Sequence, residues 1–177
     1  HDRDRTLDVV IVRPGWVPFG PGDLKGFPPL AATLAKGSMP VAGDPQRLIC
    51  SVFAPNLAEG IRLAVTHADA PGKIFNITDG VRLSWDDYLR GIGRGLGVDL
   101  TYRRIPLPLA VTAAACAEAL WLPFGPRHRP PLTRYLARLM TRDLHFSCAR
   151  AEEVLGYRPL VPFEEGLAQT VEWWKSL

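Results

Sequence analysis

Apolar and polar positions along this chain repeat with two periods, which predict a β, α, β, α order followed by a mainly helical second half. The runs VVIVR (9–13) and KIFNI (73–77) are short and strongly apolar, which is typical of buried parallel strands. Between them, residues 56–68 place apolar side chains on one helical face at Leu57, Ile61, Ala64 and Ala68. Because a parallel crossover usually contains a helix, we expect the two runs to be neighbouring or near-neighbouring parallel strands of one sheet, with this helix on its face.

The first apolar run leads into the segment RPGWVPFGPGD (13–23), which contains three prolines and three glycines. Proline fixes the backbone angle φ and glycine permits tight turns, so this composition predicts a loop with a fixed backbone. Loops that leave the carboxyl ends of parallel strands are where α/β enzymes hold their ligands. The segment is therefore the first candidate for a binding site.

Capping residues mark a helix in the middle of the chain. Ser84 is followed three residues later by Asp87, a pattern that predicts a helix start. The segment GIGRGLG (91–97) resembles a phosphate-binding loop, but it follows this helix instead of a strand and lacks the third glycine of G-x-G-x-x-G. We interpret it as the end of the helix, capped by Gly97.

Composition and charge exclude several classes of protein. The chain has 177 residues, 47% of them hydrophobic and 22% charged, which suits one globular domain. The net charge of +3 comes from scattered arginines, densest in 127–134, and argues against nucleic-acid binding. Cys50, Cys116 and Cys148 are far apart and have no nearby histidine cluster, so we expect no metal site and no disulfide, but reduced cysteines in a cytoplasmic protein. A polar start at His1 that runs directly into a strand suggests a fragment of a longer chain.

A series of motifs, in order, resembles a known family. They are RPG, FGPGD, NLAEGIRLA, GKIFNITDGVRLSWDDYL, RIPLPLA, PPLTRYL, HFS and RAEEVLGYRPLVPFEEGLAQTVEW. Together they resemble the C-terminal half of extended short-chain dehydrogenases, within the NAD-dependent epimerase/dehydratase group and its 3β-hydroxysteroid dehydrogenase-like branch. The resemblance covers nearly the whole chain.

The resemblance implies an α/β fold, made of the C-terminal part of a Rossmann-type parallel sheet and a small, mostly helical substrate-binding domain. Residues 1–177 would be this C-terminal half. The Rossmann part would comprise about 1–23 and 52–80. The substrate-binding part would comprise about 24–51 and 81–177.

The resemblance also implies a cofactor, NAD or NADP, with its nicotinamide carboxamide held by backbone groups of Pro14, Gly15, Trp16 and Val17. A rigid backbone suits this role, because hydride transfer requires the ring to stay in contact with the substrate. The alternative is a loop that only connects two domains. The sequence departs from the family in having one extra residue in this loop, and Pro55 where the family has an aspartate.

Catalysis in this family uses a tyrosine general base whose pKa is lowered by a lysine four residues later. The four tyrosines here are followed at that spacing by Ile92, Pro106, Leu139 and Val161. We therefore expect no catalytic residue in this chain.

Substrate contacts are implied for Phe19, Leu24, Pro29 and Leu30, and less directly for Arg134 and Tyr135; ordinary packing is the alternative for each. Arg134, with Arg127 and Arg129, could hold a phosphate or belong to a solvated basic loop.

Residues 107–125 are almost entirely apolar, which predicts a helical segment packed on the protein, with weak membrane-surface contact as the alternative.

The resemblance implies NAD(P)-dependent oxidation or reduction of a secondary alcohol or ketone, on a lipophilic, steroid-like small-molecule substrate. A nucleotide-sugar epimerase or dehydratase and a non-catalytic, cofactor-sensing scaffold are the alternatives. The partners implied are an N-terminal Rossmann half of the same protein and a second copy in a homodimer. Finding Tyr-x-x-x-Lys upstream of His1 would favour an enzyme, and its absence a scaffold.

Overall fold

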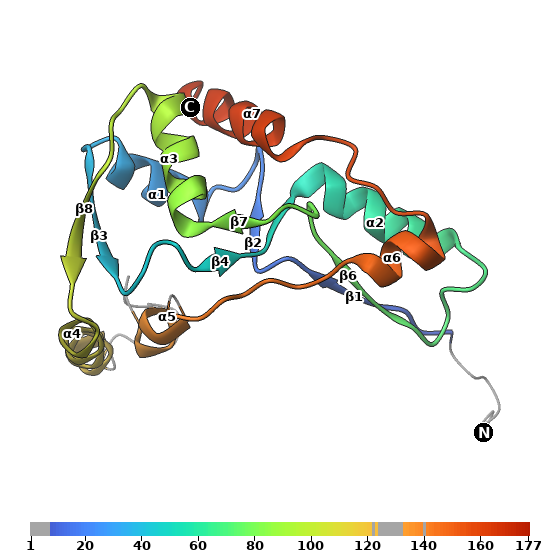
Figure 1. The fold of residues 1–177 in the computed structure, drawn as a ribbon, viewed down its shortest axis with the longest axis horizontal. Helices are drawn as coiled ribbons and strands as arrows, with labels where there is room; N and C mark the ends of the chain where they lie inside the picture. The colour runs from blue at the N-terminus through green and yellow to red at the C-terminus, as the bar shows by residue number, and fades with distance from the viewer. Residues whose placement is uncertain (1–7, 122, 124–132, 140) are drawn as a thin grey trace. The chain divides into compact units, whose positions relative to one another are not determined.

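The structure is a computed structural model that describes residues 8–121, 123, 133–139 and 141–177 (Figure 1). The chain forms two compact units. The first unit comprises residues 1–28, 50–83 and 145–177, and the second comprises residues 29–49 and 84–144.

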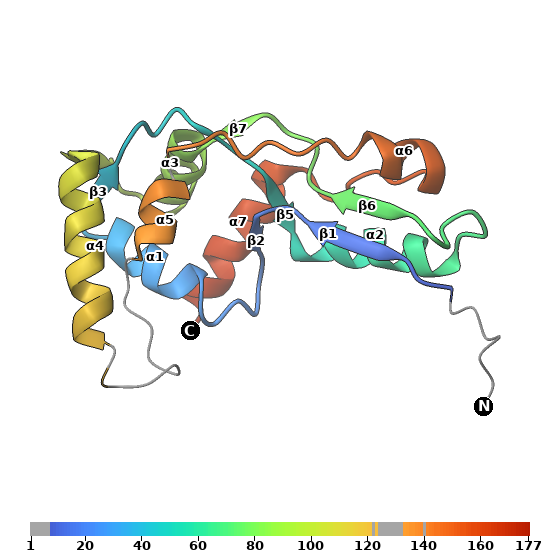
Figure 2. The same ribbon diagram turned by 90° about the horizontal axis from the view of Figure 1, so that it is seen from below.

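Short parallel strand pairs form the centre of the first unit. Strand β1 (Ile11–Pro14) pairs in parallel with β6 (Ile74–Ile77), and Figure 2 shows the two side by side. Strand β2 (Val17–Phe19) pairs in parallel with β5 (Ser51–Phe53). The predicted parallel arrangement of the runs 9–13 and 73–77 is confirmed.

Helix α2 (Ala54–Thr66) joins β5 to the turn before β6 and packs on both strands. Pro55 lies in its first turn, where the missing N–H costs nothing. The buried residues are Asn56, Gly60 and Ala64, whereas Ile61 of the predicted face is 43% exposed. Leu57 of the predicted face packs against the core, but the fully buried positions are small or polar, so the predicted face was partly wrong.

Helices α6 (Ala149–Leu155) and α7 (Phe163–Lys175) complete the first unit. Helix α6 packs on β6, and α7 packs on β5. The core cluster contains Val52, Ala64, Ala70, Phe75, Ile77, Ala151, Leu155 and Tyr157. Residues 145–177, which we assigned to the substrate-binding part, therefore pack with the Rossmann-type strands; their functional assignment stays a prediction.

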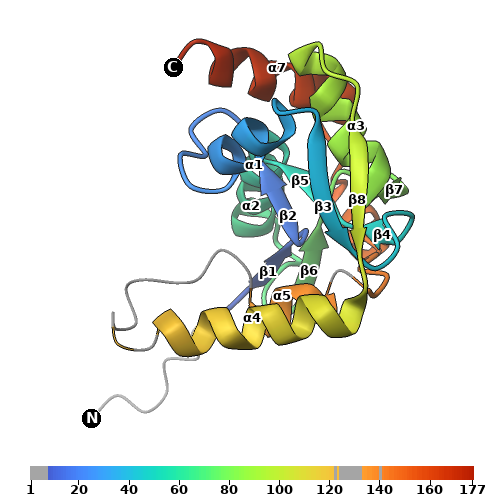
Figure 3. The same ribbon diagram turned by 90° about the vertical axis from the view of Figure 1, so that its left-hand side faces the viewer.

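The second unit contains another parallel pair, β3 (Ser38–Ala42) and β8 (Thr101–Ile105), visible side by side in Figure 3. Helix α1 (Phe27–Leu34) leads into it from the first unit. The remaining elements are β4 (Leu48–Ile49), β7 (Leu83–Ser84), α3 (Trp85–Leu96), α4 (Leu107–Trp121) and α5 (Arg134–Leu139).

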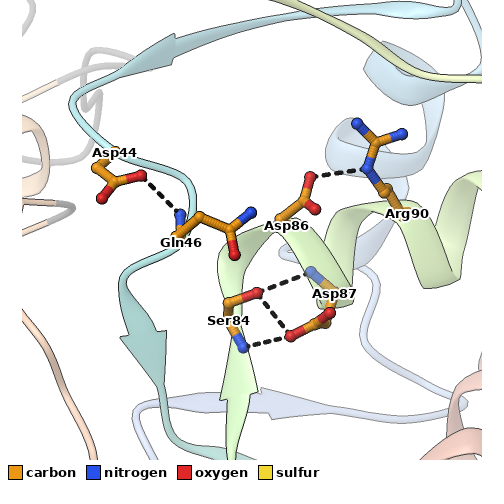
Figure 4. Close-up of polar contacts among 6 residues, drawn as sticks. All are labelled: Asp44, Gln46, Ser84, Asp86, Asp87 and Arg90. Carbon is orange, nitrogen blue, oxygen red and sulfur yellow. Dashed lines mark hydrogen bonds and ion pairs between the residues drawn. The ribbon is translucent and has the colours of Figure 1, made fainter.

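Hydrogen bonds fix both ends of α3, and Figure 4 shows those at its start. The Asp87 N–H donates to Ser84 Oγ at 3.1 Å, and the Ser84 N–H donates to Asp87 Oδ2 at 3.0 Å, which confirms the predicted capping box. Gly97 ends the helix in the left-handed conformation, with φ of 73°. The segment 91–97 is thus a helix end, as predicted.

Helix α4 buries a narrow alanine face, at Ala110 and Ala114, and packs against α5. Its other side carries exposed apolar residues, Leu109 at 60% and Leu120 at 67%. Within the described residues, no helix has both the length and the apolarity that crossing a bilayer would need. Residues 122, 124 and 125 of the predicted segment 107–125, and Arg127 and Arg129, lie outside the described residues.

Candidate functional site

The segment Pro14–Val17 lies at the carboxyl end of β1, and Gly15 is its most constrained residue. The Gly15 N–H donates to the Ile77 carbonyl at 2.8 Å. A Cβ at Gly15 would lie 2.8 Å from the Ser51 carbonyl oxygen, which is shorter than the contacts that Cβ atoms make in proteins. Glycine is therefore needed for close approach of two backbones, and the segment has a fixed position, as its composition predicts.

Val17 begins strand β2, which runs beside β5. The Val17 N–H donates to the Cys50 carbonyl at 2.9 Å, and Val17 pairs with Ser51 in the parallel ladder. Two backbone donors of the segment are thus used inside the protein, and Pro14 has none. Its carbonyl oxygens, with two lone pairs each, can still accept a hydrogen bond from a ligand amide.

A buried carboxylate, Asp79, holds together the elements at this edge of the strands. It accepts hydrogen bonds from Ser51 Oγ at 2.9 Å, from the Phe53 N–H at 2.9 Å and from Asn56 Nδ2 at 2.8 Å. Helix α2 has no side-chain cap of its own. The Asp79 carboxylate therefore fixes β5 and the start of α2 relative to β6.

Sequence reasoning missed Asp79 and its partner Asn56. The available signal was an acidic residue two positions after the apolar run KIFNI, because side chains just past the end of a strand meet the carboxyl ends of neighbouring parallel strands. Asn56 was assigned only to the start of a helix. Its amide also bonds the Val161 carbonyl and the Leu160 and Val161 N–H groups, which no local pattern indicates.

Two described tyrosines lie in surroundings that disfavour ionisation. The Tyr157 hydroxyl is buried and donates to the Thr78 carbonyl at 2.9 Å, and burial raises its pKa. Burial and the nearby Asp86 carboxylate raise the pKa of Tyr102 to about 12. A general base near neutral pH needs a lowered pKa. Neither tyrosine therefore suits a proton-transfer role.

Cys50 and Cys148 are both buried. Burial raises the pKa of each thiol, which keeps the nucleophilic thiolate scarce. Among the described residues, no group of three or more histidine, cysteine or acidic side chains is arranged to hold a metal ion.

The predicted substrate residues of the first unit have different surroundings. Phe19 is 2% exposed, and its ring packs 5.4 Å from that of Phe53 and 5.6 Å from that of Phe163. This is a core position, which favours the packing alternative for Phe19. Leu24 is 68% exposed, and the Asp23 carboxylate beside it accepts from the Gly26 and Phe27 N–H groups at the start of α1.

In the second unit, Pro29 is exposed and Leu30 half-buried on α1. Arg134 and Tyr135, at the start of α5, line a hollow of about 580 Å³ together with Glu118, Arg138, Leu139 and Arg142. The structure therefore brings Arg134 and Tyr135 together at one concave surface. A substrate contact stays a prediction for all six candidates.

Comparisons with known proteins add the context of a family. No protein-family model matches the chain. Over 162 residues it is 30% identical to the decarboxylating sterol-4-alpha-carboxylate 3-dehydrogenase of Schizosaccharomyces pombe, covering 88% of this chain and 47% of the relative. Over 182 residues it is 30% identical to short-chain dehydrogenase/reductase family 42E member 1 of Homo sapiens, covering 98% of this chain and 45% of the relative. The chain is a relative of the short-chain dehydrogenases/reductases.

This short-chain dehydrogenase relative spans about half the length of the curated relatives it matches. Among solved structures, the dTDP-glucose 4,6-dehydratase of Streptomyces venezuelae, with NAD bound, superposes with a TM-score of 0.65 at 26% identity, covering 98% of this chain and 45% of that chain. The fold matches the C-terminal region of the epimerase/dehydratase Rossmann-type fold, which confirms the predicted fold class. Similar structures contain NAD or NADPH.

Proposed function

We propose that this chain is part of an NAD(P)-dependent oxidoreductase that acts on a secondary alcohol or ketone of a lipophilic, steroid-like substrate. The observation that carries the proposal is the segment Pro14–Val17, held by backbone hydrogen bonds at the carboxyl end of β1. Ligands of parallel α/β sheets bind at this edge. The similarity to a sterol dehydrogenase supports the reaction type and the apolar substrate.

The residues present fit the nicotinamide end of such a cofactor. When bound, the nicotinamide would accept or supply a hydride. The carbonyl oxygens of the segment Pro14–Val17 would offer acceptors for the two N–H donors of its carboxamide. The hydrogen bonds from Gly15 to Ile77 and from Val17 to Cys50 would keep this wall in place, which favours a constant distance between the ring and the substrate.

The name of the S. pombe relative also describes a substrate with an anionic group, because a sterol-4-alpha-carboxylate carries a carboxylate next to the carbon that bears the reacting oxygen. We propose the same chemical class here: an apolar ring system with a hydroxyl or ketone and a carboxylate. A hydroxysteroid without the carboxylate is the simpler alternative substrate.

A nucleotide-sugar epimerase or dehydratase is the second candidate. The observation that favours it is the similarity to the dTDP-glucose 4,6-dehydratase of S. venezuelae, at 26% identity over 98% of this chain. Both candidates use a nicotinamide cofactor in the same fold, so only the substrate separates them.

The test is a turnover assay on the longest protein that the gene encodes, including any sequence upstream of His1. We expect reduction of NAD⁺ or NADP⁺ with a 3β-hydroxysteroid or its 4-carboxylate, followed by the absorbance of the reduced cofactor. Turnover of dTDP-glucose or a UDP-sugar without steroid oxidation would replace the first candidate by the second. Cofactor binding without turnover of any of these substrates would contradict both and favour a non-catalytic scaffold.

The edge of β1 suggests a partner. Val9 is 48% exposed and Ile11 46% exposed, and among the described strands β1 pairs only with β6. We propose that an N-terminal Rossmann half of the same protein supplies further strands here, because apolar strand edges are normally paired or covered. A homodimer and weak membrane-surface contact through 107–125 are further proposals about the whole protein.

A further inference from the structure

The hollow beside α5 combines an apolar wall with a row of positive charges. Its volume of about 580 Å³ lies in the range of small-molecule sites. The Tyr135 ring and Leu139 supply apolar surface, and Tyr135 is 70% exposed. Arg134, Arg138 and Arg142 line the same hollow at intervals of four residues.

The first arginine of this row is already neutralised. Arg134 Nε donates to Glu118 Oε2 at 2.6 Å, and the Arg134 N–H donates to Glu118 Oε1 at 2.8 Å. These hydrogen bonds hold the pKa of Glu118 below its ordinary value, so this carboxylate is charged at neutral pH. The pair connects α4 to α5. The Glu118 carboxylate is therefore bonded to Arg134 and does not neutralise the other arginines.

The other two arginines have no carboxylate partner among the described residues. Six ion pairs are found there, and none includes Arg138 or Arg142. The neighbouring carboxylate, Asp143, accepts from Arg47 at 3.3 Å and from the Leu48 N–H at 2.9 Å. Two guanidinium groups therefore line a partly apolar hollow in which the nearby acidic groups are bonded to other residues.

We propose that this hollow binds the carboxylate of an apolar small molecule, with Arg138 and Arg142 as the anion ligands and with Tyr135 and Leu139 against the apolar body. A planar guanidinium can bond both oxygens of a carboxylate. The choice of a carboxylate on a steroid-like body rests on the proposed function, whereas the anion site itself rests on the arginine row. Binding at this site can be measured without enzymatic turnover.

The test measures ligand binding to the chain by calorimetry, with three probes that separate charge from apolar surface. Cholate carries a carboxylate on a steroid body, its methyl ester carries the body without the charge, and acetate carries the charge alone. We expect cholate to bind at least about tenfold more tightly than either of the other two, because the ester loses a hydrogen bond to a charged group and acetate loses the apolar contact.

Variants locate the site. Arg138→Gln and Arg142→Gln should each weaken cholate binding about tenfold, whereas Arg103→Gln, an exposed arginine on β8 of the same unit, should leave it unchanged. Unchanged thermal unfolding of each variant would exclude loss of folding as the cause.

Three results would overturn the proposal: equal binding of cholate and its methyl ester, equal binding of cholate and acetate, or no effect of the two substitutions. Binding to vesicles that contain phosphatidylglycerol, without binding of free cholate, would overturn it in favour of a lipid surface. Steroid turnover by the full-length protein without cholate binding would remove this site and leave the proposed function intact. Cholate binding without steroid turnover would support the binding site and contradict the proposed function.

Discussion

Gly15 has no side chain because the backbone of a neighbouring strand takes the space. A Cβ there would meet three backbone atoms of β5 and the preceding residue, at 2.8 to 3.0 Å. Backbone atoms inside a paired strand cannot move aside as the end of a side chain can. The candidate cofactor loop therefore depends on this one residue for its position.

Gly15→Ala should lower the free energy of unfolding by about 1–3 kcal/mol, the usual cost of overpacking. Urea denaturation followed by circular dichroism measures it. Lys25→Ala, at an exposed position after this loop, is the control and should change stability by less than about 0.5 kcal/mol. Equal stability of Gly15→Ala and the parent chain would show that β5 can move away.

Tyr102 makes stability sensitive to alkaline pH. Burial and the Asp86 carboxylate raise its pKa to about 12, while Arg90 lies over its ring at 5.2 Å and opposes the shift. An unfolded tyrosine ionises near pH 10. Because the folded pKa is the higher one, this group's contribution to stability is complete below about pH 10 and is lost as the pH rises towards 12.

Tyr102→Phe should therefore lose less stability than the parent chain between about pH 9 and pH 11. The measurement is the urea midpoint at several pH values in this range. Tyr135→Phe, at a side chain that is 70% exposed, is the matched control and should follow the parent curve. Parallel curves for the parent chain and Tyr102→Phe would rule out this source of pH dependence.

At the scale of elements, α2 lies close to β6 at Gly60, which faces the Ile77 side chain. A Cβ at Gly60 would lie 2.6 Å from Ile77 Cγ2 and 2.8 Å from Cδ1. The contact is with a side chain, so it can be relieved by shortening that side chain. The two positions are therefore energetically coupled.

A double-mutant cycle tests this coupling. Gly60→Ala should cost about 1–3 kcal/mol by overpacking, and Ile77→Ala about 2–5 kcal/mol by leaving a cavity. The double variant should be more stable than the sum of the two costs predicts, by at least about 1 kcal/mol. Additive effects would mean that the layers separate instead.

The control for the helix itself is Gly95→Ala on α3. Gly95 is exposed, so alanine there should act mainly through helix propensity and stabilise the helix by about 0.5–1 kcal/mol. Opposite signs at Gly60 and Gly95 would separate close packing from helix propensity. A gain at both positions would contradict the close approach of α2 to β6.

At the scale of the whole molecule, the chain spans about half the length of its curated relatives, and the proposed cofactor site involves only the segment Pro14–Val17. The loop Pro14–Val17 could meet the nicotinamide. No G-x-G-x-x-G sequence is present in the chain, and the glycine loop with its helix N-terminus supplies most of the anion binding in such folds.

Residues 1–177 expressed alone should therefore bind NAD(H) and NADP(H) no better than about millimolar, catalyse nothing and tend to self-associate. A few backbone contacts do not offset the entropic cost of immobilising a dinucleotide, and the apolar edge of β1 favours association. Calorimetric titration and analytical ultracentrifugation measure the two properties. Micromolar affinity in a monomeric sample would contradict the assignment of the cofactor site.

The sequence alone determined the features that depend on neighbours along the chain. Apolar runs indicated β1 and β6, and the crossover between them indicated their parallel pairing. Ser84 with Asp87 and Gly97 marked both ends of α3, because a cap acts within one turn of its helix. The ordered motifs were enough to predict the similarity to short-chain dehydrogenases.

Only the tertiary structure decided which residues meet across the chain. Asp79 bonds to Ser51 and Asn56, 28 and 23 residues away, and no local period records such a contact. The buried face of α2 runs through Gly60 instead of Ile61, because the space left by Ile77 selects the smaller residue. Helix periodicity gives the spacing of a buried face, but its position around the helix is set by the surface it packs on.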